Sequence, residues 1–114
     1  MTTGSITSHD LLIVSNGPGT LETAWTLIAR AHRAGALVAV ITAQPTAELP
    51  QKADLLLVMP GQTMAEGTAS TSAQPMGSVF EQAMWILFDA LVVQLKDDLE
   101  ETYESMTARH TNLE

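Results

Sequence analysis

A glycine-rich segment after the first apolar run is the first place where the residues of this chain could bind a ligand. Residues 15–20 are Ser-Asn-Gly-Pro-Gly-Thr, and they follow the apolar residues 11–14 directly. A loop between a strand and a helix lies where ligands bind in open α/β sheets, and free N–H groups at a helix start suit a phosphate. The segment is neither a Walker loop nor a G-x-G-x-x-G motif. A tight turn that needs glycine for its backbone angles is the simpler interpretation of the loop alone.

A carboxylate near the start of the longest apolar segment is the second candidate. Glu81 follows Gly77 and Ser78, which are ordinary residues at a helix start. The helix dipole favours a carboxylate in the first turn, so Glu81 has a structural explanation. Apolar neighbours raise the pKa of a carboxyl and so suit it to general acid or base chemistry. The expected apolar neighbours of Glu81 are Val79, Phe80, Met84 and Trp85. A rival carboxylate, Asp89, is expected to be paired with a cation or a backbone donor in the core.

Three histidines and the lack of cysteine narrow the possible chemistry further. We expect His9 and His32 on the surface, and no two histidines have the spacing of metal ligands, so no metal site is predicted. His110 lies in the polar tail, residues 108–114, for which the residues alone indicate a frayed terminus. The absence of cysteine excludes disulfides, thiolate zinc sites and a cysteine nucleophile.

Three short apolar runs predict the strands that would position these residues. Residues 11–14, 37–41 and 55–58 are apolar without alternation, which is typical of parallel strands buried on both faces. Residues 20–34 have apolar side chains at helical spacing, which makes the first two runs a βαβ unit with a right-handed crossover. Residues 46–52 have room for about one helical turn between two prolines.

Glycine and threonine residues mark the expected ends of the first helix. Gly19 and Thr20 lie where an N-cap is expected, and Gly35 is placed as the C′ residue, which often has a left-handed backbone.

The second half of the sequence predicts a loop and a long helix. Residues 64–74 are small and polar, which indicates a mobile loop. Residues 79–95 are apolar on nearly every side, which predicts a central, buried helix. Their most apolar window, residues 83–95, is too short to span a bilayer. After Lys96 an acidic face predicts either a second helix or a bent continuation of the first.

Composition places these elements in one acidic domain, residues 1–114. A hydrophobic fraction of 46% excludes a wholly disordered chain, and a formal net charge of -8 excludes nucleic acid and anionic membrane surfaces as expected partners. Residues 1–8 lack the basic and apolar regions of a signal peptide, so we expect a cytoplasmic protein. Three strands leave apolar edges, so we expect an oligomer, most simply a homodimer or homotetramer.

Five segments together resemble the 6-phospho-3-hexuloisomerases of the sugar isomerase (SIS) superfamily. Residues 2–6 resemble the family's T-T-P-x-I, residues 10–13 its D-L-L-I, and residues 39–42 its A-L-I-T. Residues 74–81 are similar to its Q-P-M-G-S-x-F-E, and residues 109–114 to its terminal R-H-x-N-L-E. The resemblance implies an α/β, SIS-like and flavodoxin-like parallel sheet flanked by helices. It also implies a sheet reduced here to about three strands with a long C-terminal helix.

The sequence departs from the family pattern in two places. Residues 15–21 stand where the family has G-S-G-S-G-E-T, whose hydroxyls hold the sugar phosphate, and Ser15 and Thr20 supply hydroxyls one place away. The family also begins with helices and a first strand–loop unit that this chain lacks, so the chain resembles the second half of the family's domain.

The resemblance implies a sugar-phosphate isomerase without a cofactor or metal. Such an enzyme interconverts a 3-hexulose 6-phosphate and fructose 6-phosphate through an enediol, with Glu81 as the base and His110 as the proton shuttle. The residues expected to hold the phosphate are Ser15, Asn16, Gly17, Gly19, Thr20 and Arg109. The alternatives are a non-catalytic SIS-like module for sugar-phosphate binding or subunit assembly and, with least support, a purely structural assembly protein.

Overall fold

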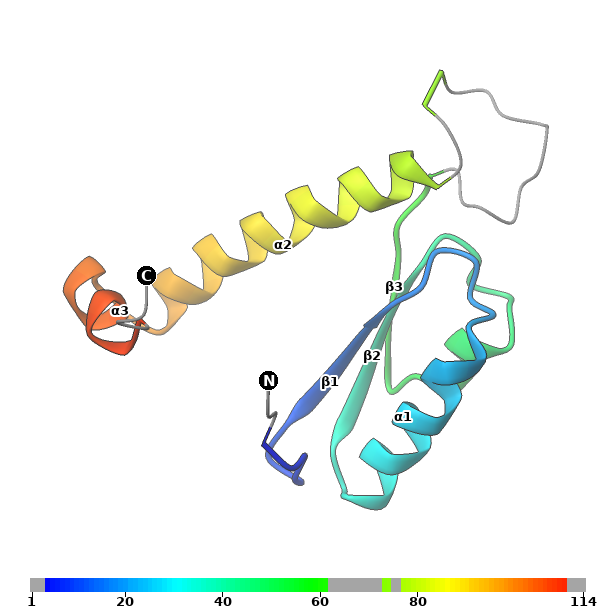
Figure 1. Ribbon diagram of the computed structural model, residues 1–114, viewed down its shortest axis with the longest axis horizontal. Coiled ribbons are helices and arrows are strands. Elements are labelled where there is room, and N and C mark those ends of the chain that lie inside the picture. The colour runs from blue at the N-terminus through cyan, green and yellow to red at the C-terminus, as the bar shows by residue number, and fades with distance from the viewer. Residues whose placement is uncertain (1–3, 62–72, 75–76, 111–114) are drawn as a thin grey trace. The chain divides into compact units, whose positions relative to one another are not determined.

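The computed structural model describes residues 4–61, 73–74 and 77–110. The chain forms two compact units, Met1–Ala83 and Met84–Glu114. In chain order the elements are β1 (Leu11–Ser15), α1 (Glu22–Arg33), β2 (Leu37–Thr42), the 3-10 helix η1 (Leu49–Lys52), β3 (Leu55–Val58), α2 (Ser78–Asp98) and α3 (Tyr103–Arg109) (Figure 1). The first six begin or lie in the first unit, and α2 continues into the second. The loop expected at residues 64–74 lies almost wholly outside the described residues.

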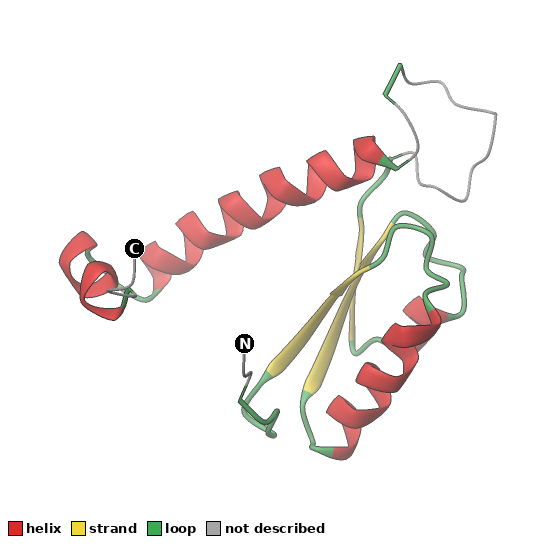
Figure 2. Ribbon diagram, in the orientation of Figure 1, coloured by secondary structure: helices red, strands yellow, loops and turns green. Residues whose placement is uncertain are grey.

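The three strands form one parallel sheet in the order β1-β2-β3. Leu11 is paired with Leu37, and Ala39 with Leu55, so the central strand is matched in register on both sides. Strands, helix α1 and connections alternate as a βαβ unit should (Figure 2). The predicted α/β fold with three parallel strands and a long helix near the C-terminus is therefore confirmed.

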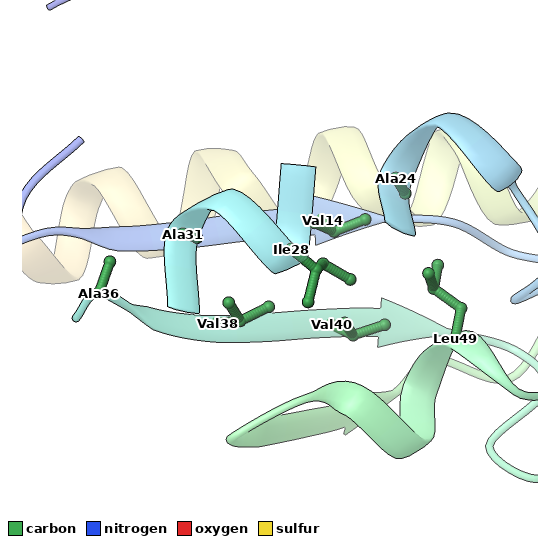
Figure 3. Close-up of a cluster of buried hydrophobic side chains, with 8 residues drawn as sticks. All are labelled: Val14, Ala24, Ile28, Ala31, Ala36, Val38, Val40 and Leu49. Atoms are coloured by element: carbon green, nitrogen blue, oxygen red, sulfur yellow. The ribbon is translucent and has the colours of Figure 1, made fainter. Parts of the chain in front are cut away.

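Helix α1 covers one face of this sheet and makes the core of the first unit (Figure 3). Ala24, Ile28 and Ala31 lie at positions i, i+4 and i+7, so they share one side of the helix, and all three are buried. Val38 and Val40 point to the same face of β2 and are fully buried. The full cluster is Val14, Ala24, Ile28, Ala31, Ala36, Val38, Val40 and Leu49.

A glycine ends α1 as the sequence predicts. Gly35 has a φ of +80°, and its N–H donates to the carbonyl of His32 at 3.0 Å. The N–H of Ala36 donates to the carbonyl of Ala31 at 3.0 Å. This pair of bonds is a Schellman motif, which requires a left-handed residue at its centre and turns the chain sharply into β2.

The second unit contains the end of α2 and a separate short helix, α3. Glu100 adopts a φ of +53° after α2, which breaks the helix without a glycine. Thr102 and Ser105 then form a capping box at the start of α3. The second-helix alternative is therefore the correct one. The tail was expected to be irregular from residue 108, but α3 continues to Arg109.

Burial on both faces, expected for all three strands, is found among the described residues only in part of the central strand. Val40 and Ile41 point to opposite faces of β2 and both are buried, whereas all four residues of β3 are exposed. The unbroken apolar runs correctly predict that both faces of the sheet are apolar. They do not indicate which segments cover those faces.

Helix α2 also differs from the expectation of a central, buried element. Most of its side chains after Met84 are exposed, and Trp85 is 74% exposed. At 21 residues the helix is longer than the apolar window considered from the sequence, and its length and composition would allow it to cross a membrane. Core helices of globular proteins meet the same criterion, so this property carries no conclusion about a membrane.

An aspartate between the β2 and β3 strands ties three elements of the first unit together. The Oδ2 atom of Asp54 accepts hydrogen bonds from the N–H of Val38 at 2.8 Å and from Nε2 of His32 at 3.0 Å. His32 is on the surface as predicted, but no pattern in the residues indicates that Asp54 is its partner. The bond from Val38, and then the bond from His32, hold the pKa of Asp54 below its ordinary value.

We expect Asp54 to make the stability of the first unit depend on pH. A carboxyl whose pKa is lowered by folding stabilises the fold above its unfolded pKa, and this contribution is lost as the pH falls through the lowered folded pKa. Urea unfolding between pH 6 and pH 2 should therefore show a steeper loss of stability in the native chain than in Asp54→Asn. Asp89→Asn, the same change at an exposed position, is the control and should leave the slope unchanged. Identical slopes in all three proteins would contradict this role for Asp54.

Candidate functional site

The carboxyl ends of the three strands meet at one edge of the sheet. Because the strands are parallel, the segments after β1, β2 and β3 all emerge there. They are residues 16–21, 43–48 and 59–61. This is the edge at which open α/β sheets bind ligands.

Backbone hydrogen bonds hold the glycine-rich loop against the end of β2. The N–H of Asn16 donates to the carbonyl of Ile41 at 2.9 Å, and the N–H of Ala43 donates to the carbonyl of Gly17 at 3.1 Å. The buried Thr42 hydroxyl donates to the same Gly17 carbonyl at 3.0 Å. It also accepts from the N–H of Gln44 at 3.0 Å. Thr42 thus joins the first two loops of the edge, a role that sequence reasoning missed although the residue lies in a motif shared with the family.

Gly19 needs to be glycine for two independent reasons. Its φ is +71°, a left-handed conformation that side chains disfavour. A Cβ at this position would lie 2.8 Å from Cβ of Ala47 and 3.3 Å from Cδ of Pro50. The backbone requirement expected of the loop is therefore confirmed at Gly19.

The start of α1 differs from the expected cap. The N-cap is Leu21, without a side-chain cap, rather than Gly19 or Thr20. Asn16 supplies the missing acceptor, because its Oδ1 atom accepts from the N–H of Thr20 at 2.9 Å and of Leu21 at 3.4 Å. An asparagine reaching forward to cap a helix start is a known alternative to a capping residue at the N-cap itself.

The loop residues expected to bind phosphate therefore divide into three groups by their burial. Gly17 and Gly19 are buried and belong to the turn, whereas Ser15 and Thr20 are exposed at its surface. Asn16 is half-buried and engaged with the helix start. Their role toward a phosphate stays a prediction, and the two exposed hydroxyls are the groups that an incoming ligand reaches first.

Glu81 lies on the first turn of α2, and its N–H donates to the carbonyl of Gly77 at 3.1 Å. A Cβ at Gly61 would lie 3.5 Å from the Cα of Phe80, so this turn packs directly after the end of β3. Glu81 is therefore held near the carboxyl edge of the sheet by its own unit.

The expected apolar enclosure of Glu81 is wrong for this chain. Phe80 and Met84 are buried, but Glu81 itself is exposed and so is Trp85. Phe80 and Met84 are one helical turn apart and share a side of α2, whereas Glu81 follows Phe80 by about 100° around the helix. Asp89, the rival carboxylate, is exposed too and not in a core.

The two functional candidates of the tail lie at the end of α3. Arg109 donates from Nη2 to Oε1 of Glu101 at 2.7 Å, and the Ser105 hydroxyl also bonds to Glu101. The bond from Ser105, followed by the bond from Arg109, lowers the pKa of Glu101. His110 is the C-cap of α3, and its N–H donates to the carbonyl of Thr107 at 3.1 Å. The role expected for Arg109 toward a phosphate stays a prediction, and residues 111–114 lie outside the described part.

The described residues contain no group of three or more His, Asp or Glu side chains placed to hold a metal ion. The exposed His9 agrees with the surface position that was expected for it.

Comparison with known proteins identifies relatives over the whole chain, although no family model matches it. A 3-hexulose-6-phosphate isomerase of Bacillus subtilis is 32% identical over 113 residues, which are 98% of this chain and 61% of that protein. Proteins of the same name from Mycobacterium gastri and Methylomonas aminofaciens are 34% and 36% identical, and 57% and 61% of their lengths are covered. The chain is a homologue of the 3-hexulose-6-phosphate isomerases. The resemblance drawn from the motifs is confirmed, and the chain spans about three fifths of the length of the curated relatives it matches.

Solved structures agree with this assignment. A hypothetical protein of Methanococcus jannaschii, whose structure was taken to infer a 3-hexulose-6-phosphate isomerase, has a TM-score of 0.78 and 26% identity. The match covers 100% of this chain and 60% of that one. A second hypothetical protein has a TM-score of 0.81 and 27% identity, with 61% of its chain covered.

Replacing Gly19 with alanine should destabilise the first unit. The left-handed backbone and the contact with Ala47 together predict a loss of about 1–3 kcal/mol in the free energy of unfolding, measured by urea denaturation. Gly4→Ala is the control, because a Cβ at Gly4 meets no atom within 4 Å. Equal stability of the two variants would show that the loop relaxes around the added methyl group.

Proposed function

We propose that this chain carries the isomerising part of a 3-hexulose-6-phosphate isomerase, which interconverts 3-hexulose 6-phosphate and fructose 6-phosphate. Homology over at least 98% of the chain to three proteins of that name is the observation that supports it most. The substrate is then a phosphorylated sugar. The gathering of the strand-end loops and Glu81 at one edge of the sheet supports a ligand site there.

Glu81 is proposed as the base of this reaction. Its carboxylate takes the proton from C2, beside the C3 carbonyl, and the electrons of that C–H bond form the C2–C3 double bond of an enediolate. Returning a proton to C3 and moving the hydroxyl proton from O2 to O3 leaves the carbonyl at C2, so atoms and charge balance. The exposed position of Glu81 on the first turn of α2 leaves its carboxylate accessible to a substrate.

His110 is proposed to move protons between the two substrate oxygens. An imidazole suits this role because it donates and accepts protons near neutral pH. Arg109, beside it, offers a guanidinium for the substrate phosphate and would exchange its contact with Glu101 for that anion.

The exposed hydroxyls of Ser15 and Thr20 are proposed to bind the phosphate at the start of α1. The N–H groups of Thr20 and Leu21 would also donate to the phosphate, once their hydrogen bonds to Oδ1 of Asn16 are broken. We also propose that the chain works as a homodimer or homotetramer, for which the exposed apolar residues of α2, such as Trp85, offer an interface.

A non-catalytic module for sugar-phosphate binding or subunit assembly is the second candidate. Two observations favour it: the chain covers only 57% to 61% of its named relatives, and Asn16 satisfies the amides that a phosphate would use.

Replacing Glu81 with glutamine should abolish isomerisation, because the amide keeps the size of the side chain and cannot accept the proton. The expected fall in kcat is about 10²- to 10⁴-fold, measured by coupling fructose 6-phosphate formation to its oxidation. Asp89→Asn removes an exposed carboxylate from the same helix and should keep full activity. A fully active Glu81→Gln protein would exclude Glu81 as the base.

Removing residues 110–114 should also abolish activity without disturbing the fold. The cut leaves the Arg109–Glu101 ion pair and the capping box of α3 in place. Circular dichroism should show unchanged helix content, while the coupled assay shows no turnover. His110→Asn separates the imidazole from the rest of the tail. An active truncated protein would remove His110 from the mechanism, and loss of helix content would instead give the tail a structural role.

A further inference from the structure

Thr42 is the one buried polar side chain among the residues that the structure describes. It follows Val38 and Val40, which face α1 (Figure 3), at alternate positions of β2 and therefore lies on the same face of the strand. Valine has nearly the same shape and would continue this apolar row. A buried hydroxyl loses its hydrogen bonds to water, and bonds within the protein only offset that loss. Packing therefore does not account for a threonine at this position.

The hydroxyl of Thr42 connects the segments that follow two of the strands. It donates to the carbonyl of Gly17 at 3.0 Å, after β1, and accepts from the N–H of Gln44 at 3.0 Å, after β2. The carbonyl of Gly17 also accepts from the N–H of Ala43 at 3.1 Å, so both of its lone pairs are used. Together these hydrogen bonds fix the orientation of the peptide group between Gly17 and Pro18.

The turn held in this way separates the two exposed hydroxyls that are proposed to bind the phosphate. Ser15 precedes the turn at the end of β1, and Thr20 follows it before the start of α1. A second carbonyl of the turn, that of Gly19, accepts from the N–H of Leu49 at 3.2 Å. Any residue at position 49 except proline supplies that N–H, whereas the bonds to the turn from the side chain at position 42 require a hydroxyl.

The backbone of Thr42 makes a separate connection to the third strand end. Its carbonyl accepts from the N–H of Met59 at 2.9 Å, directly after β3. That segment continues to Gly61, which lies beside the first turn of α2, where Glu81 is placed. Because this bond uses the backbone, a change of the side chain leaves it intact. Loss of the hydroxyl alone is therefore expected to disturb the turn after β1 and not the position of the proposed base.

We propose that Thr42 is a positioning residue for the substrate phosphate, because its hydroxyl holds the turn after β1 in the conformation that directs Ser15 and Thr20 to one anion. The inference rests on the proposed function and deepens it at the phosphate site. Thr42 is fully buried and acts through the turn, without contact to the substrate. Loss of its hydroxyl weakens substrate binding and leaves the chemical step nearly unchanged, so KM rises while kcat is kept.

Two pairs of proteins that differ by the hydroxyl test this role. The native chain is compared with Thr42→Val, and Thr42→Ser is compared with Thr42→Ala, so the second pair decides if Thr42→Val does not fold. Val38→Ala is the control, because it removes buried apolar volume from the same face of β2 near the end of the strand that is opposite the loops. Calorimetry with fructose 6-phosphate gives Kd, and the coupled assay gives KM and kcat.

Within each pair, we expect loss of the hydroxyl to raise Kd and KM about tenfold or more and to change kcat by less than about threefold. Val38→Ala lowers the fraction of folded protein, and with it the apparent kcat, but leaves the Kd and KM of the folded molecules unchanged. Equal Kd values within the folded pairs, or an equal rise of Kd in Val38→Ala, would overturn the proposal.

The native chain distinguishes this inference from the proposed function. A native chain that binds fructose 6-phosphate without turnover counts against the proposed isomerisation alone, and Kd in the two pairs still decides the role of Thr42. A native chain that binds no fructose 6-phosphate excludes both the proposed phosphate site and this role. Full activity with equal Kd values in both pairs excludes only the role of Thr42.

Discussion

The packing of α1 on the first two strands is the interaction on which the rest of the first unit depends. Ile28 and Ala31 lie against Val38 and Val40 in a cluster closed by Leu49. Burying a side chain of the size of isoleucine contributes about 1.5–3 kcal/mol, so a few such residues account for much of the stability of a unit this small. Because the helix must lie along the strands to make these contacts, its two ends fall at opposite edges of the sheet.

Each end then imposes its own requirement on the connecting loop. At the amino edge, Gly35 reverses the chain within a Schellman motif, and Asp54 bonds both β2 and the last turn of α1. At the carboxyl edge, the loop between β1 and α1 has to pass close to Ala47, which only Gly19 allows. The turn and ligand interpretations of the glycine-rich loop are therefore compatible: its glycines shape the turn, and its exposed hydroxyls remain for a ligand.

Apolar surface exceeds what the described chain covers in both units. In the first unit it includes all four side chains of β3, together with Leu11 and Leu37, and in the second it includes the exposed side chains of α2. The same limit explains why Glu81 is exposed rather than enclosed by apolar side chains. Residues that would surround a carboxylate in a complete site need not belong to the 114 residues of this chain, and its longer relatives contain additional ones.

Local structure follows from the order of the residues alone. The three apolar runs fix the strands to within one residue at each end, and the apolar spacing of residues 24, 28 and 31 fixes the buried side of α1. These features depend on near neighbours in the chain, so their period is visible in the residues. The motifs of residues 74–81 and 109–114 also sufficed to indicate the relatives found by comparison.

Which of these surfaces are covered, and which polar groups meet, depends on how segments distant in the chain pack together. Asp54 accepts from His32 across 22 positions, Thr42 bonds to Gly17 across 25, and no periodicity encodes either contact. Asn16 caps α1 from outside the helix, which propensity rules placed at Gly19 or Thr20. Burial, too, is a property of the assembled segments. Leu49 is fully buried and Leu55 is 54% exposed, although the residue type is the same. Hydrophobic stabilisation follows the apolar area that is removed from water, and this area depends on which segments pack over a residue.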